Sequence, residues 1–375
     1  MRKVGGSARV ARYLMRQIRT HGPGQSLPSF RSISQDCKVS ATTLSSVIRQ
    51  FEKRGLLVVR SKQGVYTPPT IPAERTRVEL LDVLYVGADP QVVSHIAFRQ
   101  DMLWHLGQQP SQLGYSVRFH GIHADPSGIA EIEQVAEDPE CEACLVINLS
   151  SLAHLQPLQD AHVPYVAIYP ESPEVPAHNC VTVDHTHIVA SQLQHLLDRG
   201  HRHIGYLYKV RDHTFRRSEY FQREAFYRMA LKHRLPIDDS DVQYAGLESA
   251  DQIEGIHALL DKPNPPTAII CNDAHLPELY KAAEHFNLRI GHDLSVIGAN
   301  DGPEVTAVSP PATTLRIPRG QAVKIGLEML ETILHSSDAT TPNRNVAVSL
   351  IERASTGRAP TSVPRTQAQP QVSSI

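Results

Sequence analysis

The sequence predicts an α/β protein that begins with a winged helix-turn-helix and continues as a two-lobed domain of doubly wound parallel sheets. Three observations predict this fold. The first 66 residues combine excess positive charge with three helical patterns and two short β-runs. From Leu80 onward, apolar strand-like segments alternate with helical segments, as in parallel α/β sheets. The chain also has 375 residues, too many for one ordinary core, so two or three domains are expected.

Positive charge is concentrated at the N-terminus. Residues 1–66 contain 13 Lys and Arg but only two acidic residues, Asp36 and Glu52, which gives this segment a net charge of +11. Since the whole chain carries −2, the remainder carries −13. A basic segment attached to an acidic body indicates a polyanionic partner for that segment, and the alternative is a solvated basic face.

Several other classes of protein are disfavoured. No stretch approaches ~18 consecutive apolar residues, and the N-terminus lacks an apolar signal core, so we expect a cytoplasmic protein with no membrane partner. The five cysteines are scattered, and the single C-x-x-C at Cys141 and Cys144 lacks the further ligands of a zinc site, so no metal and no cofactor are expected. The absence of a G-x-S-x-G, P-loop or G-x-G-x-x-G motif argues against an enzyme.

The first domain, residues 1–68, is predicted from helical periodicity and turn signals. Apolar residues recur every three or four positions over 7–21 and again over 41–54, where Ser40 can cap the helix and Gly55 can end it. The positions expected to face inward are Val10, Leu14, Ile18, Leu44, Val47, Ile48 and Phe51. A short helix lies between them. Two β-runs joined by a tight turn follow, and this order of elements is that of a winged helix-turn-helix.

The third helix of this domain is expected to enter the major groove of DNA. Small hydroxyl side chains in its first turn can reach phosphates or base edges, and the hairpin tip can reach the neighbouring backbone. Thr42 and Thr43 could instead be neutral helix surface. The residues expected at the DNA are Arg31, Ser40, Ala41, Thr42, Thr43, Ser45, Arg49, Lys62, Gln63 and Gly64.

Four stretches in this domain, residues 27–31, 39–44, 51–56 and 64–66, resemble the GntR family of regulators. The resemblance implies that Arg31, Ser40, Thr42 and Gly64 lie at the DNA. Ala41 and Ser45 stand where the family usually has arginines, so the operator is expected to differ from the common family site.

The rest of the chain is predicted as a linker, an effector domain and a tail. Prolines at 68, 69 and 72 predict an extended linker, and a C-terminal stretch rich in Pro, Ser, Thr and Gln predicts disorder. The predicted boundaries are 69–79 for the linker, 80–182 with 313–335 for one lobe, 183–312 with 336–355 for the other, and 356–375 for the disordered tail.

The body resembles the LacI/GalR effector domain, which is related to periplasmic sugar-binding proteins. Six motifs in chain order carry this resemblance: Val183-Asp184, His195–Tyr206, Arg223–Phe226, Pro266–Asp273, Gly291–Gly298 and Thr313–Pro318. The resemblance implies a small-molecule effector bound between two lobes, most simply a sugar, with a nucleoside or another non-sugar metabolite as the alternative. A GntR-like domain joined to a LacI-like domain is known from arabinose-type repressors.

Effector-binding residues are expected at the carboxyl ends of strands, where parallel sheets bind ligands. A polyol needs bidentate donors and amide or carboxylate acceptors there. The candidates are Asp89, Tyr169, Asp184, Arg223, Asn272, Asp273, Asn300 and Asp301. Other roles stay open for three of them: a salt bridge for Arg223, a helix cap for Asp273 and a turn for Asp301. Asn300 stands where the LacI/GalR family usually has aspartate.

Together these features predict a ligand-responsive, sequence-specific DNA-binding regulator. We expect a repressor that acts as a homodimer on a double-stranded, pseudo-palindromic operator. A ligand-binding protein without a DNA function is the second alternative, but it leaves the basic residues 1–66 unexplained.

Overall fold

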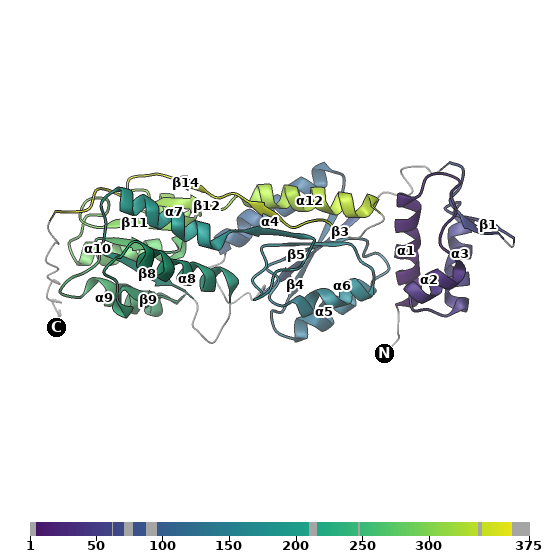
Figure 1. Ribbon diagram of the computed structural model, residues 1–375, viewed down its shortest axis with the longest axis horizontal. Coiled ribbons are helices and arrows are strands. Elements are labelled where there is room, and N and C mark those ends of the chain that lie inside the picture. Colours follow the sequence, from purple (N-terminus) through teal and green to yellow (C-terminus); the bar gives the residue numbers. More distant parts are fainter. Residues whose placement is uncertain are drawn as a thin grey trace, which may run out of the picture. The chain divides into compact units, whose positions relative to one another are not determined.

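The computed structural model describes residues 5–61, 63–70, 78–87, 96–209, 216–246, 248–336 and 340–361, without side chains for 96–99 (Figure 1). Within these ranges the predicted fold class is confirmed: a small helical domain with a hairpin precedes two α/β sheets. The chain divides into two compact units. The first comprises residues 1–89, 104–182 and 320–344, and the second comprises residues 90–103, 183–319 and 345–375.

The N-terminal domain contains α1 (Gly6–Thr20), α2 (Phe30–Asp36), α3 (Ala41–Lys53), β1 (Val58–Arg60) and β2 (Gly64–Tyr66). The Ser40 hydroxyl accepts a 3.2 Å hydrogen bond from the Thr43 amide, so the predicted cap of α3 is confirmed. Gly55, with φ of 69°, follows α3 and ends it. The β1 and β2 strands form the predicted antiparallel hairpin.

One buried cluster holds this domain together. The apolar faces of the three helices meet the base of the hairpin, and the predicted inward positions of α1 and α3 are buried. A core of this kind fixes the exposed face of α3 relative to the hairpin. Its buried members are Val10, Leu14, Ile18, Leu27, Ile33, Cys37, Leu44, Val47, Ile48, Phe51, Leu56, Leu57 and Val65.

The first unit also contains a six-stranded sheet in the order β13-β7-β6-β5-β3-β4. Its neighbouring strands are parallel from β4 through β7. Figure 1 shows α5 and α6 on one side of this sheet and α12 on the other. The elements are β3 (Leu80–Val86), α4 (Ile96–Gln112), β4 (Ser116–Ile122), α5 (Ser127–Glu137), β5 (Cys144–Ile147), α6 (Gln156–Asp160), β6 (Tyr165–Ile168), β7 (Cys180–Val183), α12 (Arg319–His335) and β13 (Arg344–Val346).

The second unit contains a six-stranded sheet in the order β14-β12-β11-β10-β8-β9, parallel except for β14. Helices α9 and α10 pack on one face, and on the other Phe226 of α8 stacks on Tyr206. The elements are α7 (His185–Asp198), β8 (Ile204–Tyr208), α8 (Arg217–Lys232), β9 (Val242–Tyr244), α9 (Ser249–Leu260), β10 (Ala268–Ile270), α10 (Leu276–His285), β11 (Ser295–Asn300), α11 (Glu304–Ala307), β12 (Thr313–Arg316) and β14 (Ser349–Ile351).

The predicted point at which the chain returns to the first lobe is wrong. Residues 313–316 form β12, which pairs in parallel with β11 through Ile297 opposite Thr313 and therefore belongs to the second sheet. Residues 320–344 belong to the first unit, including the predicted second-lobe segment 336–344 as far as the structure describes it. The alternation of strands and helices in the sequence did not reveal this, because β12 is a four-residue strand whose partner is set by long-range pairing.

The predicted disordered tail begins too early. Residues 356–361 are described, and several of them contact other segments of the second unit: the Thr356 hydroxyl lies 2.9 Å from His195 Nε2, and the Gly357 amide donates to Ser295 Oγ at 3.0 Å. Ala359 N donates to the Arg199 carbonyl. Long-range contacts of this kind are not visible in the polar composition that suggested disorder. Residues 362–375 lie outside the described residues.

Candidate nucleic-acid interface and effector site

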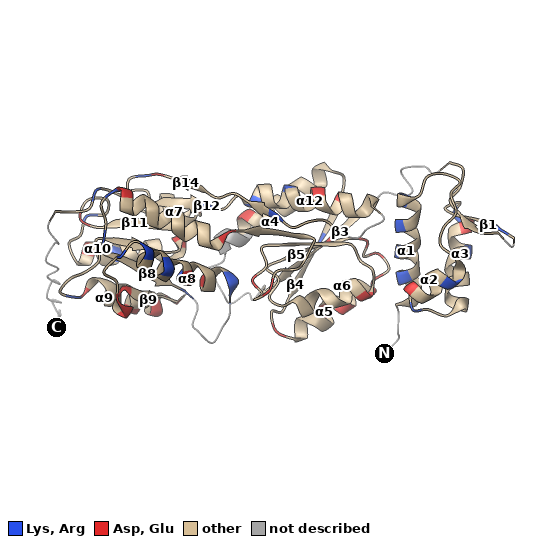
Figure 2. Ribbon diagram, viewed as in Figure 1, with Lys and Arg blue, Asp and Glu red and all other residues tan. Residues whose placement is uncertain are grey.

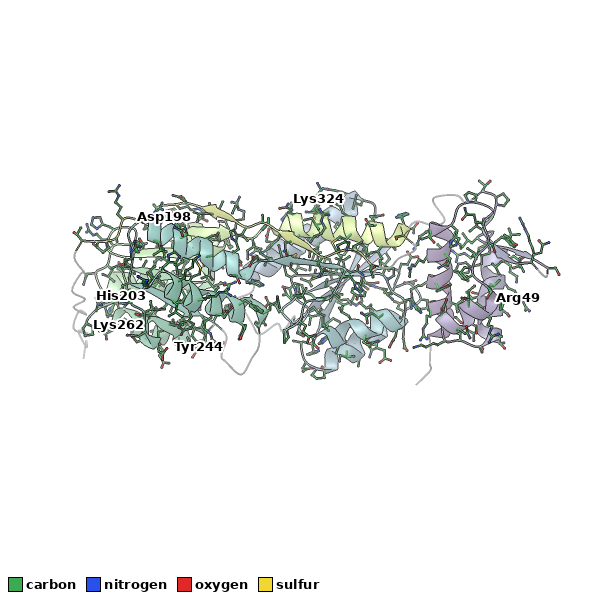
Figure 3. All side chains as sticks on the ribbon, viewed as in Figure 1. Arg49, Asp198, His203, Tyr244, Lys262 and Lys324 are labelled. Atoms are coloured by element: carbon green, nitrogen blue, oxygen red, sulfur yellow. The ribbon has the colours of Figure 1, made fainter. Side chains whose placement is uncertain are left out.

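The exposed face of α3 carries three of the ten side chains predicted to contact DNA. Ala41, Thr42 and Arg49 are exposed, and Figure 3 labels Arg49 on this domain. The Ser45 hydroxyl donates to the Ala41 carbonyl at 2.8 Å, so it is held against the helix backbone. This face offers methyl, hydroxyl and guanidinium groups to a groove.

Other predicted DNA residues lie next to the recognition helix or on the hairpin. Ser40 caps α3 and remains exposed, so both roles are compatible. Thr43 is half-buried, with its hydroxyl 3.0 Å from that of Ser40. Arg31, Gln63 and Gly64 are exposed, whereas Lys62 lies outside the described residues.

The hairpin has two features that the sequence reasoning only partly anticipated. Gly64 has φ of 116°, which favours glycine, and a Cβ there would meet nothing within 4 Å. The Arg60 guanidinium lies 4.2 Å from the Tyr66 ring centroid across the hairpin. Arg60 was not among the residues predicted to contact DNA, although its place on a strand beside the turn was an available signal. It is therefore a further candidate for a phosphate contact.

The basic residues of the first domain do not all lie on one exposed face. Figure 2 shows Lys and Arg along α1, but Arg12 is only 9% exposed, with its guanidinium bonded to main-chain carbonyls of the same unit. Arg12 was counted among the positive charges expected to face a polyanion. Its burial corrects that expectation for this residue. A buried guanidinium with carbonyl acceptors is compensated within the protein.

In the first unit, the candidate effector residues lie at the carboxyl ends of β5 and β6. Tyr169 follows β6, is buried, and has φ of 53°. Asn148 follows β5 with φ of 58°, and its Nδ2 donates to Tyr85 Oη at 3.1 Å. Ile147 pairs with Ile168, so Asn148 and Tyr169 are neighbours at one sheet edge. The sequence reasoning missed Asn148, although its position directly after an apolar strand was the available signal. Asp89 lies outside the described residues.

In the second unit, Arg223 and two tyrosines meet at the carboxyl ends of β8 and β9. The Arg223 guanidinium carbon lies 4.6 Å from the Tyr208 ring centroid, and this ring lies 5.7 Å from that of Tyr244, which Figure 3 labels. Lys209 Nζ pairs with Glu219 at 3.4 Å. A cation on an aromatic face suits a ligand with oxygen substituents and a flat or apolar ring face.

The loops after β10 and β11 supply two amides to the same sheet edge. Asn272 Oδ1 accepts from the Ala274 amide at 3.1 Å and so caps the turn after β10. Asn300 ends β11 with φ of 113°, and its carbonyl accepts from Arg319 Nη1 at 3.2 Å. Both amides are half-buried.

The three predicted carboxylates that the structure describes have structural partners. Asp184 caps α7 by accepting from the His187 amide at 3.0 Å. Asp301 bonds Arg316 at 2.6 Å and Arg353 at 2.7 Å; burial acts against ionisation, but these arginines lower the pKa of the Asp301 carboxyl. Both carboxylates therefore already bond to groups of the protein, so their charges are partly compensated without a ligand.

Asp273 is the most enclosed of these carboxyl groups, at 2% exposure. It accepts from the Gly302 amide and the Thr314 hydroxyl, both at 2.9 Å, and burial raises its pKa to about 7. It therefore ties the loop after β11 to β12. Neighbouring His275 is buried and lies 2.7 Å from the Ala245 carbonyl, and burial lowers its pKa to about 4.

Two further groups of titratable side chains bond with one another. His203 and Lys262, both labelled in Figure 3, bind the buried carboxylate of Asp241 at 2.8 and 2.5 Å. Cys141 and Cys144 are buried free thiols with their sulfurs 3.6 Å apart, and the pKa of Cys144 is well above its usual value because of its hydrogen bond to Cys141 and its burial. Among the described residues, no three or more His, Cys, Asp and Glu side chains are arranged to hold a metal, and no described helix is long and apolar enough to span a membrane.

Comparison with known proteins supports this division of the chain. Residues 7–67 match the model described as bacterial regulatory proteins, gntR family, and residues 193–356 match the periplasmic binding protein-like domain. The arabinose metabolism transcriptional repressor of Geobacillus stearothermophilus is 23% identical over 326 residues, covering 82% of this chain and 86% of that protein.

Two solved structures resemble the fold. A LacI-family regulatory protein from Chloroflexus aggregans has a TM-score of 0.64 and 25% identity, covering 74% of this chain and 98% of its own. The transcriptional regulator CelR in complex with cellobiose has a TM-score of 0.64 and 17% identity, and the match covers 88% of this chain and 100% of that one. The chain thus joins an N-terminal region that matches the gntR family of bacterial regulatory proteins to a region that matches the periplasmic binding protein-like domain.

Proposed function

We propose that this protein is a transcriptional repressor whose affinity for an operator is set by a small-molecule effector, and that it acts in the cytoplasm, where its DNA lies. The observation that carries the proposal is the exposed polar face of α3 beside the hairpin, in a chain that also holds two parallel sheets with polar side chains at their carboxyl ends. The repressor named for arabinose metabolism supports this assignment, because the similarity covers 82% of this chain and 86% of that protein.

On DNA, the first turn of α3 would read base edges in the major groove, with Thr42 and Ala41 nearest the bases. Arg49, Arg60 and Arg31 would contact phosphates and position the helix. One such domain covers only a half-site. A homodimer that places two domains on a pseudo-palindromic operator is therefore proposed, since dimers of this motif bind half-sites about one helical turn apart.

The effector is proposed to be a sugar. Arg223 supplies a forked donor, Asn272 and Asn300 supply amides, and the rings of Tyr208 and Tyr244 can face the apolar side of a sugar ring. The names of two related proteins point the same way, one by arabinose metabolism and one by its cellobiose complex. The same tyrosine pair would also stack on a nucleobase, which keeps a nucleoside as the second candidate. The proposal includes no catalytic step.

Selection from random DNA duplexes tests the DNA-binding part, using the full chain at two salt concentrations. Enrichment of one pseudo-palindromic sequence is expected, and affinity should fall with salt because phosphate contacts release counterions. The variant with both Thr42→Ala and Arg49→Ala should lose this enrichment. Recovery of unselected sequences at every salt concentration would refute the proposal.

A thermal-shift screen over neutral sugars and nucleosides tests the effector part, because a ligand that binds only the folded state raises the midpoint of unfolding. A sugar that raises the midpoint and also changes operator affinity is expected. A nucleoside doing both instead would replace the sugar assignment. A ligand that shifts the midpoint without changing operator affinity would argue against regulation.

A further inference from the structure

Arg12, in the middle of α1, binds four main-chain carbonyls of the α/β part of the first unit. Its Nη2 donates to Ala136 O at 2.6 Å, Nη1 donates to Asp138 O and Cys141 O at 3.1 and 3.0 Å, and Nε donates to Ala161 O at 3.1 Å. The side chain is almost completely buried, and desolvation lowers the pKa of its guanidinium. All three guanidinium nitrogens are therefore bonded to segments more than 100 residues away in the sequence.

Three of these four acceptors lie where two helices end. Ala136 is in the last turn of α5 and Asp138 is its C-cap, while Ala161 is the C-cap of α6. Carbonyls at helix C-termini lack intrahelical partners and carry partial negative charge, so they favour a cation. Only a guanidinium presents enough donors in a rigid fork to satisfy such a set, and lysine does not.

Further contacts extend this surface beyond one side chain. His162, next to Ala161, lies 3.1 Å from the Asp36 carbonyl at the end of α2, and its ring contacts that of Tyr13 edge-on at 6.3 Å between centroids. A cavity of about 770 Å³ adjoins Arg12. The charged side chains that line it have opposite signs on the two parts: Arg12, Arg16, Arg19, Lys53 and Arg54 from the N-terminal domain, and Glu79, Glu140 and Glu142 from the segments beyond it.

The contacts made by α1 leave the predicted DNA-binding face of α3 exposed. Ala41, Thr42 and Arg49 keep their solvent exposure while Arg12 is buried. Docking of α1 is thus compatible with DNA binding and would orient the DNA-binding domain. In a dimer, binding of the second half-site is intramolecular, and an orientation that matches the half-site spacing raises the effective concentration of the second domain.

We infer that the α1 surface centred on Arg12 is the docking site for the carboxyl ends of α5 and α6 of the same chain, and that this docking sets the orientation of the DNA-binding domain for a two-half-site operator. The inference rests on the proposed function, to which it adds the positioning residue. Arg12 touches neither DNA nor effector in this scheme and acts only through the docked helix.

The test compares Arg12→Gln and Arg12→Lys with Arg9→Gln, a matched control on the same helix. Arg9 Nη1 donates to the Cys37 carbonyl at 3.1 Å, a contact inside the N-terminal domain. Each variant is titrated with the selected full operator and with a single half-site. Both Arg12 variants should lose about tenfold affinity for the full operator, a typical coupling, and keep half-site affinity within about twofold. Arg9→Gln should match the wild type on both.

Amide hydrogen exchange of residues 136–142 and 161–163, measured on the same proteins without DNA, reports docking independently. Faster exchange is expected in the Arg12 variants only. Unchanged exchange in Arg12→Gln would overturn the docking, and wild-type operator affinity despite faster exchange would overturn its role in orientation. Wild-type operator affinity and wild-type amide exchange in Arg12→Lys would overturn the need for the guanidinium fork. Failure of the wild type to select any DNA sequence would instead refute the proposed function, and with it the orienting role.

Discussion

The guanidinium of Arg223 lies on the face of Tyr208, with 4.6 Å between the Arg223 Cζ atom and the ring centroid. Three residues further along α8, Phe226 is fully buried and stacks on Tyr206 at 5.0 Å between centroids. The helix is thus anchored on the sheet directly beside the arginine. This arrangement holds Arg223 at the carboxyl end of β8 before any ligand arrives, which reduces the entropy lost on binding.

Replacing Arg223 with alanine should abolish the response to effector and leave operator affinity without effector unchanged. The reason is that a forked donor to ligand oxygens is lost while the DNA-binding face is untouched. The measurement is operator titration with and without the sugar found by thermal shift. Arg228→Ala is the matched control, since Arg228 is exposed on the same helix and pairs with Glu224 at 3.5 Å. An undiminished response in Arg223→Ala would remove this residue from the site.

The exposed residues of α3 should separate into two kinds of DNA contact. Arg49→Ala should weaken binding to all sequences and reduce the slope of log K against log salt by about 1, because one phosphate contact is lost. Thr42→Ala should leave the slope unchanged and relax the preference at one base position. Lys281→Ala, an exposed residue of α10 that pairs with Glu278 at 2.8 Å, serves as the control. Equal slopes for Arg49→Ala and the wild type would exclude the phosphate contact.

Ser40 should show its two roles in two different substitutions. Ser40→Ala removes the cap of α3 and should lower stability by about 1 kcal/mol. Ser40→Asp retains a capping oxygen, so stability should be kept, but the added negative charge should strongly weaken DNA binding. Ser29→Ala is the control, because Ser29 caps α2 through the Ser32 amide and is not a predicted DNA contact. Unweakened binding by Ser40→Asp would place Ser40 away from the DNA.

Local signals in the sequence predicted the N-terminal domain well. The cap at Ser40, the stop at Gly55 and the apolar spacing of Leu44, Val47 and Ile48 each depend on residues within one or two helical turns. The alternation of strands and helices likewise predicted both parallel sheets. The same rule suggested effector residues at the carboxyl ends of strands, but it missed Asn148, Tyr208 and Tyr244, which lie there too.

Features set by distant contacts were not predictable in this way. The sheet to which β12 belongs depends on its pairing with β11, and the burial of Arg12 depends on carbonyls 124 to 149 residues away. Asp273 is a similar case: its position after a strand suggested a ligand contact, but the Thr314 hydroxyl that binds it lies 41 residues further on. A charged residue in sequence does not reveal which partner neutralises it.

The buried carboxyl of Asp273 should make stability depend on pH in a direction opposite to that of most carboxylates. Burial raises its pKa from 3.8 to about 7. Between these two values the folded protein keeps a proton that the unfolded chain releases, so the contribution to stability is complete below about pH 4 and is lost as the pH rises to 7. The loss is on the order of 4 kcal/mol.

Asp273→Asn cannot ionise, and its amide can still accept from Gly302 and donate to Thr314. The variant should therefore lose less stability than the wild type in urea unfolding between pH 5 and 8 and should be the more stable protein at pH 8. Asp301→Asn is the control: the pKa of Asp301 is lowered, so its substitution should reduce stability evenly across this range. If Asp273→Asn kept the wild-type pH dependence, the carboxyl of Asp273 would have to be ionised in the folded protein, with a cation near it.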